Sequence, residues 1–147
     1  MSNRIKIVPF KPEHLELIDF KENFNASECP KTVMNTAFTF MLEGVPLAVI
    51  GGFPFIPGVI HFWSWIGRAV RKCPIEFQKK CLETIEWYER NEKPRRIQWE
   101  VRADYEMGQR WAESLGLKRE GVLCKWNPDG TDAYLYGRVN ACLKLLP

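Results

Sequence analysis

A change of hydrophobic period in the middle of the chain constrains the fold most. Residues Val59–Ile66 form an almost continuous apolar and aromatic run, which is typical of a buried central strand. From Pro74 to about Glu92, apolar residues recur at helical spacing with charges between them. Between Arg96 and Val101, apolar and polar residues alternate as they do in a strand. This order predicts two parallel, adjacent strands joined by a helical crossover.

The rest of the chain extends this unit into an α/β pattern. Turn residues at Glu43-Gly44 predict a hairpin, and Gly51-Gly52 with the prolines that follow predicts another turn. The 147 residues fit a single domain with a central mixed sheet and helices on both faces. Further strands are predicted at Arg4–Val8, Ala37–Leu42, Val45–Phe53, Lys118–Trp126 and Ala133–Val139, and further helices at Pro12–Asn23 and Asp104–Leu115.

Composition argues against several classes of protein. A net charge of +3 is too small to indicate a nucleic-acid partner. Five cysteines, no two of them two residues apart, together with only two histidines, argue against a disulfide framework and a metal site. The longest apolar stretch, Val45–Trp65, is interrupted by prolines and glycines, so no membrane partner is expected. The start of the chain is polar and charged, and we expect a cytoplasmic protein.

Two groups of residues carry a resemblance to a known family. The segment Gln109–Gly121 reads QRWAESLGLKREG and resembles the second motif of the GNAT N-acetyltransferases, in which a helix ends in Gly-Phe before a basic residue, an acidic residue and glycine. The segments Ala26–Cys29 and Gly44–Gly52 are similar to small phage-encoded GNAT-like proteins, some of which are described as internal virion proteins of short-tailed phages. The resemblance, together with the order of elements, implies a GNAT-like domain over residues 1–147.

The resemblance also implies a cofactor and a reaction. In this family, acetyl-CoA lies where two neighbouring parallel strands splay apart, and its acetyl group is transferred to an amine. Backbone near Trp65, Ile66 and Gly67 is then implied to contact the pantetheine arm. The pyrophosphate sits on backbone N–H groups of a loop and on the N-terminus of the next helix, which together attract anions.

The phosphate loop is where the sequence departs most from the family. The family pattern is Gln/Arg-x-x-Gly-x-Gly/Ala, whereas residues 68–74 read RAVRKCP and only Gly67 stands nearby. Glycine matters there because phosphate must approach the backbone closely. Arg68, Arg71 and Lys72 are candidates to hold the phosphates by charge, and Cys73 ends the segment. The alternative is a solvated basic loop that caps a helix.

Acetyl transfer to an amine needs a proton acceptor. Glu100 is the first candidate because it lies on the strand beside the implied cofactor, and the alternative is a strand residue that faces solvent. His61 on the neighbouring strand is the second candidate, against a purely structural histidine. Glu28 lies in the loop that binds acceptors in the family, and a helix-capping role with Ser27 is its alternative.

Two functions stay open on the sequence. Ala112 stands where many family members carry the tyrosine that protonates the departing thiolate. Tyr105, Tyr134 or Tyr136 could substitute, or could simply pack. One hypothesis is an acetyl-CoA-dependent N-acetyltransferase acting on an unknown amine. The other is a non-catalytic bacteriophage protein of the same fold, acting in virion assembly through a phage or host protein. A second copy of the chain is a further candidate partner.

Overall fold

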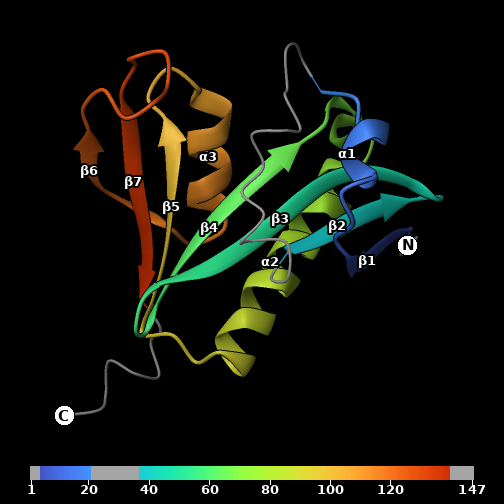
Figure 1. Cartoon of the computed structure of the whole chain (residues 1–147), viewed down its shortest axis with the longest axis horizontal. Helices are drawn as coiled ribbons and strands as arrows, with labels where there is room; N and C mark the ends of the chain where they lie inside the picture. Colours follow the sequence, from blue (N-terminus) through green and yellow to red (C-terminus); the bar gives the residue numbers. More distant parts are fainter. Residues whose placement is uncertain (1–3, 21–36, 140–147) are drawn as a thin grey trace. The chain divides into compact units, whose positions relative to one another are not determined.

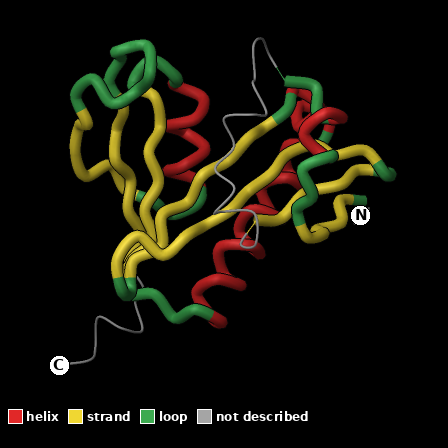
Figure 2. Tube along the Cα trace, viewed as in Figure 1, coloured by secondary structure: helices red, strands yellow, loops and turns green. Residues whose placement is uncertain are grey.

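The computed structural model describes residues 4–20 and 37–139 (Figures 1 and 2). The described strands are β1 (Ile5–Pro9), β2 (Ala37–Leu42), β3 (Val45–Ile56), β4 (Val59–Ile66), β5 (Arg96–Arg102), β6 (Lys118–Leu123) and β7 (Ala133–Val139). The described helices are α1 (His14–Leu17), α2 (Pro74–Asn91), α3 (Glu106–Ser114) and the 3-10 helix η3 (Arg68–Lys72).

The strands form a mixed sheet in the hydrogen-bonded order β1-β2-β3-β4-β5-β7-β6. Strands β4 and β5 are parallel, and their register runs from Val59 opposite Arg96 to Phe62 opposite Trp99. The pairs β1–β2, β2–β3, β5–β7 and β6–β7 are antiparallel. The predicted parallel and adjacent strands are therefore confirmed, and so is the predicted class of a mixed α/β sheet.

The chain divides into two compact units. The first unit comprises Met1–Phe53 and Trp63–Thr84, and the second comprises Pro54–Phe62 and Ile85–Pro147. Strands β3 and β4 and helix α2 each contribute residues to both units. The expectation that residues 1–147 form one domain stays a prediction, and each unit is described below by itself.

In the first unit, helices α1 and α2 cover opposite faces of the strands. Phe40 of β2 meets Phe77 of α2 edge-on, with ring centroids 5.7 Å apart. The preceding residue, Thr39, faces the other way, and its Oγ1 lies 2.7 Å from Nδ1 of His14 in α1. This alternation is the ordinary two-residue period of a strand. On the face of α1, an apolar cluster forms from Phe10, Leu15, Ile18, Ala37 and Val49, with Phe20, Trp63 and Trp65 packed against it.

In the second unit, aromatic rings pack the helices onto one face of β4 and β5. The rings of Phe62 and Trp99 stack with centroids 5.3 Å apart. Tyr88 of α2 meets Phe62 edge-on at 4.8 Å, and Trp111 of α3 meets Trp99 edge-on at 5.0 Å. Residues one position away from Phe62 and Trp99 in each strand therefore point to the opposite face.

The predicted helix over Pro12–Asn23 is wrong in its described part. The α-helix ends at Leu17, and Ile18 has an extended backbone with φ −86° and ψ 131°. The carbonyl of Asp19 accepts a hydrogen bond from the N–H of Arg68 at 2.8 Å, so this backbone bonds outside the helix. Leu15 and Ile18 are both buried as their apolar character predicts, although no long helix carries them.

The turn predicted from Gly51-Gly52 and the prolines at 54 and 57 is confirmed only at its last residue, Pro57. Strand β3 continues through both glycines to Ile56, and the turn lies at Pro57-Gly58, where Gly58 has φ +83°. Gly51 is required for a different reason, since a Cβ there would overlap the indole ring of Trp63. The helix-ending glycine predicted after α3 is confirmed, because Gly116 has φ +85°.

Within residues 4–20 and 37–139, no helix combines the length and the apolar character that crossing a membrane requires. In the same ranges, no three His, Cys, Asp or Glu side chains group as a metal site. Among the described cysteines, Cys73 and Cys81 are buried thiols and Cys124 is exposed.

Candidate functional site

The two residues predicted as proton acceptors meet in the second unit. Parallel pairing sets His61 of β4 opposite Gln98 of β5, and Glu100 follows two residues later on the same face. The Nε2 atom of His61 is hydrogen-bonded to Oε2 of Glu100. His61 is buried, whereas the side chain of Glu100 is 27% exposed and can therefore be reached by a ligand.

The hydrogen bonds around His61 have a defined direction. Arg96, which can only donate, directs its Nε–H at Oε1 of Gln98 over 3.0 Å. The amide nitrogen of Gln98 therefore faces Nδ1 of His61, at 3.1 Å. Because Nδ1 accepts, the neutral imidazole carries its proton on Nε2 and donates it to Glu100. In this arrangement Nε2 of His61 already carries a proton, whereas the carboxylate of Glu100 has lone pairs that can accept further hydrogen bonds.

Arg96 is itself anchored by an ion pair. Its two terminal nitrogens contact the two carboxylate oxygens of Glu120, with Nη1 to Oε2 at 3.0 Å. The hydrogen bonds from Arg96 lower the pKa of Glu120 from its usual value. We call the series Glu120, Arg96, Gln98, His61 and Glu100 the polar chain. It runs from Glu120 on β6, past β7, to Arg96 and Gln98 on β5, then to His61 on β4 and back to Glu100 on β5.

A β-bulge at Glu120 and the absence of a side chain at Gly137 leave room for the Arg96–Glu120 ion pair. The pairing of β6 with β7 shifts register between Arg119 and Gly121, so Glu120 is the extra residue of a β-bulge. A Cβ at Gly137 on β7 would lie 2.5 Å from Oε1 of Glu120 and 2.7 Å from Nη1 of Arg96. The ion pair therefore occupies space that a side chain at Gly137 would take.

Sequence reasoning missed three members of the polar chain: Arg96, Gln98 and Glu120. Strand alternation already places Arg96 and Gln98 on the face of Glu100, and this signal could have been used. The contact with His61 depends on the register between β4 and β5, which lie far apart in sequence. The contact with Glu120 depends on the bulge.

The segment predicted to bind phosphate lies in the first unit and forms the 3-10 helix η3. The N–H of Val70 donates to the carbonyl of Gly67 at 3.4 Å, and the N–H of Cys73 donates to that of Val70 at 3.1 Å. The guanidinium of Arg68 pairs with Asp19 at 3.0 Å. Arg71 and Lys72 are exposed, and neither has an ion-pair partner in the part of the chain that the structure describes.

Gly67 is held tightly where β4 ends. Its N–H donates to the carbonyl of Leu47 at 2.9 Å. A Cβ at Gly67 would lie 2.6 Å from Cγ2 of Ile18 and 2.8 Å from the Leu47 oxygen. The absence of a side chain at this position is therefore explained by packing within the first unit.

The other predicted cofactor residues differ in exposure. Trp65 is partly buried against Phe10, with centroids 6.2 Å apart, and Ile66 is 36% exposed. Cys73 is buried, and its carbonyl accepts the N–H of Phe77 at 2.9 Å. Burial and the nearby Glu76 raise the pKa of the Cys73 thiol. Cys73 therefore has the environment of a packing residue.

The tyrosines of the second unit are placed as follows. Ala112 is buried in α3, and Tyr105 before that helix is 47% exposed. The guanidinium of Arg119 lies 3.7 Å from the ring centre of Tyr134, and it donates to the hydroxyl of the buried Tyr136 at 3.4 Å. Ser27, Glu28 and the segment Ala26–Cys29 lie outside the described residues.

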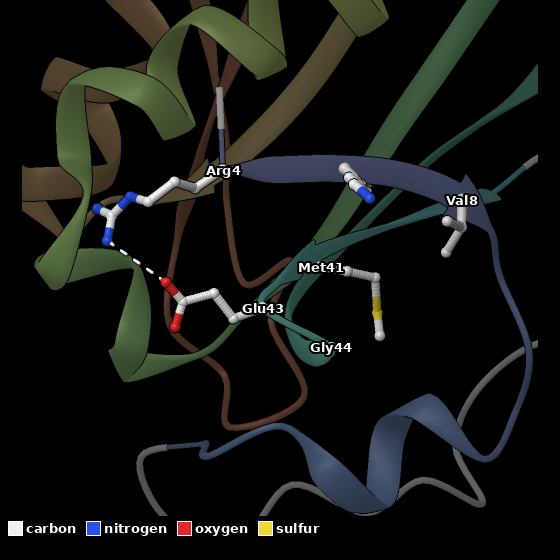
Figure 3. Close-up of a pocket in the computed structure, with 6 residues that line it drawn as sticks. Arg4, Val8, Met41, Glu43 and Gly44 are labelled. Carbon is white, nitrogen blue, oxygen red and sulfur yellow. Dashed lines mark ion pairs between the residues drawn. The ribbon is translucent and has the colours of Figure 1, made fainter. Parts of the chain in front are cut away.

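A hollow of about 560 Å³ lies in the first unit beside the edge strand (Figure 3). Arg4 and Glu43, which both line it, point toward each other in an ion pair of 4.0 Å. Arg4 is also 4.0 Å from Glu76 of α2. None of the predicted site residues lines this hollow, which is formed by Arg4, Lys6, Val8, Met41, Glu43 and Gly44.

Comparison with solved structures identifies the fold. No family model matches the sequence, and no curated protein is significantly similar to it. A GNAT-family acetyltransferase from Bacillus anthracis superposes with a TM-score of 0.74 at 17% identity, covering 92% of this chain and 95% of that one. Ard1 from Thermoplasma volcanium gives 0.67 at 16% identity, covering 92% and 97%. The microcin C7 self-immunity acetyltransferase MccE, solved with acetyl-CoA and AMP, gives 0.61 at 19% identity, covering 71% and 60%.

The chain therefore has the GNAT fold, as its second motif and order of elements predicted. At these identities the likeness shows the fold alone. Nothing in the comparisons supports a relationship to phage proteins, and the resemblance at Ala26–Cys29 and Gly44–Gly52 stays a prediction.

Proposed function

We propose that this chain is an acetyl-CoA-dependent N-acetyltransferase of the GNAT family, working in the cytoplasm, where acetyl-CoA is available. The observation that carries the proposal is the pairing of Glu100 with His61 on two parallel strands of a GNAT fold. A partly exposed carboxylate that receives a hydrogen bond from a buried imidazole is a suitable proton acceptor. The solved complex of MccE with acetyl-CoA supports the choice of acetyl donor.

In this proposal the amine nitrogen attacks the thioester carbonyl of acetyl-CoA. A C–N bond forms and the C–S bond breaks. Glu100 accepts the proton that the amine loses, and His61 keeps the carboxylate oriented through its Nε2–H. The departing CoA thiolate takes a proton from water, because Ala112 occupies the position of the family tyrosine. Thiolate is a good enough leaving group for this to suffice.

Phosphate binding is proposed to rest on charge rather than on a glycine loop. Arg71 and Lys72 are exposed and without ion-pair partners among the described residues, so both can contact phosphate. Arg68 forms an ion pair with Asp19, and it would have to break this pair to bind phosphate. Trp65, Ile66 and Gly67 are proposed to contact the pantetheine arm through backbone groups. Because surface charges bind weakly and are screened by salt, we expect affinity for acetyl-CoA to fall as ionic strength rises.

Calorimetric titration with acetyl-CoA tests the proposal, together with thermal unfolding at millimolar ligand. A ligand that binds only the folded state must stabilise it, so heat of binding and a raised Tm are expected. No heat and no stabilisation would reject acetyl-CoA binding and leave the non-catalytic alternative. Mass spectrometry of the purified protein for retained CoA is an independent check.

We propose that the acceptor is a primary amine. Release of CoA thiol should be followed with a thiol reagent across small amines, peptides with a free N-terminus and peptides with an internal lysine. Transfer to one class and not the others would identify the acceptor. Acetyl-CoA binding without transfer to any of them would reject the enzyme proposal in its present form.

A further inference from the structure

We infer that Gln98 is a positioning residue, which fixes the tautomer of His61 so that its Nε2–H points at Glu100. The consequence for catalysis rests on the proposed function. The consequence for the histidine tautomer does not, and it can be measured on the protein without any substrate.

The argument begins at the cation of the polar chain. A guanidinium has five N–H donors and no acceptor, so Arg96 must meet the oxygen of the Gln98 amide and not its nitrogen. Glu120 holds Arg96 through both terminal nitrogens, which prevents the guanidinium from turning away. The amide of Gln98 is thereby oriented, with its two N–H donors directed away from Arg96.

The second step concerns the imidazole. The amide nitrogen of Gln98 lies 3.1 Å from Nδ1 of His61, so Nδ1 must be the unprotonated nitrogen when the ring is neutral. The proton then resides on Nε2, where Oε2 of Glu100 accepts it. Phe55, with a ring centroid 6.1 Å from that of His61, is an apolar neighbour of the imidazole.

The third step is the effect of losing Gln98. Without the Gln98 donor at Nδ1, only part of the preference for the Nε2–H tautomer remains, through the carboxylate of Glu100, so the Nδ1–H tautomer becomes more populated. In the Nδ1–H tautomer, the lone pair of Nε2 would face the carboxylate of Glu100, which is repulsive. Glu100 would then lose its hydrogen bond for part of the time and take up other orientations. Acid–base efficiency depends on this geometry, whereas affinity for acetyl-CoA does not.

Nitrogen-15 NMR of the imidazoles in the intact chain tests the tautomer directly. The protein has only two histidines, so the spectrum is simple. In the wild type at pH 8.5, Nδ1 of His61 should resonate as an unprotonated nitrogen and Nε2 as a protonated one. In Gln98→Leu, the two nitrogens should move toward the average of both tautomers. His14, whose Nδ1 faces Thr39 in the first unit, serves as the internal reference and should not change.

Gln109→Leu is the matched control. Gln109 also belongs to the second unit, and its amide nitrogen donates to the carbonyls of Arg102 and Ala103 at 3.2 and 2.9 Å. This variant removes a comparable amide without touching the polar chain, so the tautomer of His61 should stay as in the wild type. A wild-type spectrum with Nδ1 protonated, or a Gln98→Leu spectrum identical to the wild type, would overturn the inference.

Kinetics separate this inference from the proposed function. In Gln98→Leu, kcat should fall roughly tenfold while KM for acetyl-CoA stays unchanged, since general acid–base catalysis is only partly lost. If the wild type shows no transfer but the tautomer shifts, the proposed function fails and the positioning role stands. If the wild type is active and Gln98→Leu changes neither the tautomer nor kcat, the positioning role fails and the proposed function stands.

Discussion

The polar chain and the η3 segment differ in how their polar side chains are held. In the polar chain, each side chain has a partner at a fixed distance, and every hydrogen bond runs in one direction from Arg96 to Glu100. In η3, backbone N–H groups are used within the segment, while Arg71 and Lys72 are exposed without ion-pair partners among the described residues. The side chains of the polar chain are thus fixed by hydrogen bonds, whereas Arg71 and Lys72 of η3 can interact with a ligand mainly through their charge. Single substitutions should therefore matter greatly in the polar chain and little in η3.

Glu100→Gln should give the largest effect. The amide keeps the shape of the carboxylate and can still accept from His61, but it cannot take a proton from the amine. We expect kcat to fall about 10²- to 10⁴-fold, while calorimetric Kd for acetyl-CoA stays the same. A variant with near-normal kcat would show that Glu100 is not the base.

Gly67→Ala tests the close packing at the start of the η3 region. A new Cβ would press on the Leu47 carbonyl and on Ile18, which should lower the free energy of unfolding by about 1–3 kcal/mol. Gly121→Ala is the control, because a Cβ there meets nothing within 4 Å. Urea unfolding should show no more than about 0.5 kcal/mol of change in the control. Equal stability of the two variants would contradict the packing argument.

Arg71→Ala combined with Lys72→Ala tests the role of charge. We expect Kd for acetyl-CoA to rise roughly tenfold at low salt, with a smaller difference at high salt, since exposed charges are screened. Arg90→Ala combined with Lys118→Ala removes the same two residue types from other exposed positions and should leave Kd unchanged. If both double variants weaken binding equally, only net charge is involved and η3 is not the phosphate site.

His14 in the first unit gives a pH-dependent prediction, with the smallest expected effect. Burial, and then the charge of Lys11, lower the pKa of His14 below 6.5. Between pH 6.5 and the lowered value, the unfolded chain binds more protons than the folded chain, so stability falls as pH falls and the loss is complete below the native pKa. His14→Gln should remove this part of the pH dependence when urea unfolding is compared at pH 7.5 and 5.5. An unchanged slope between these pH values would show that His14 is not its source.

The strands were the most predictable part of the fold, because their patterns are local. Strand β4 begins and ends at the predicted residues Val59 and Ile66, and α2 differs from its prediction by one residue at its end. The helix over Pro12–Asn23 was overestimated, because two apolar residues one turn apart fit a single helical turn as well as a long helix. The helix ends because the backbone at Ile18 is extended, and the spacing of apolar residues does not predict this change.

Two residues of the candidate site, Glu100 and His61, could be predicted from the sequence, but the contact between them could not. Glu100 and His61 were chosen separately, each as an alternative to the other, and the structure makes them one hydrogen-bonded pair. The link depends on strand register, which no local pattern encodes. The basic residues of η3 were predicted as a group, yet the pairing of Arg68 with Asp19 distinguishes this arginine from its two neighbours. That contact joins segments far apart in sequence.

Because Glu120 is the extra residue of a bulge, deleting it would separate its effect on the pairing of β6 with β7 from its effect on Arg96. Deleting this one residue would let β6 pair continuously with β7, because the register already matches on both sides of the bulge. Such a deletion should preserve, or even simplify, the sheet while leaving Arg96 without its carboxylate. We therefore expect a protein shortened by this residue to fold normally while the guanidinium of Arg96, and with it the amide of Gln98, is less firmly oriented. In this hairpin, the extra residue therefore contributes through the arginine that its side chain orients rather than through backbone pairing.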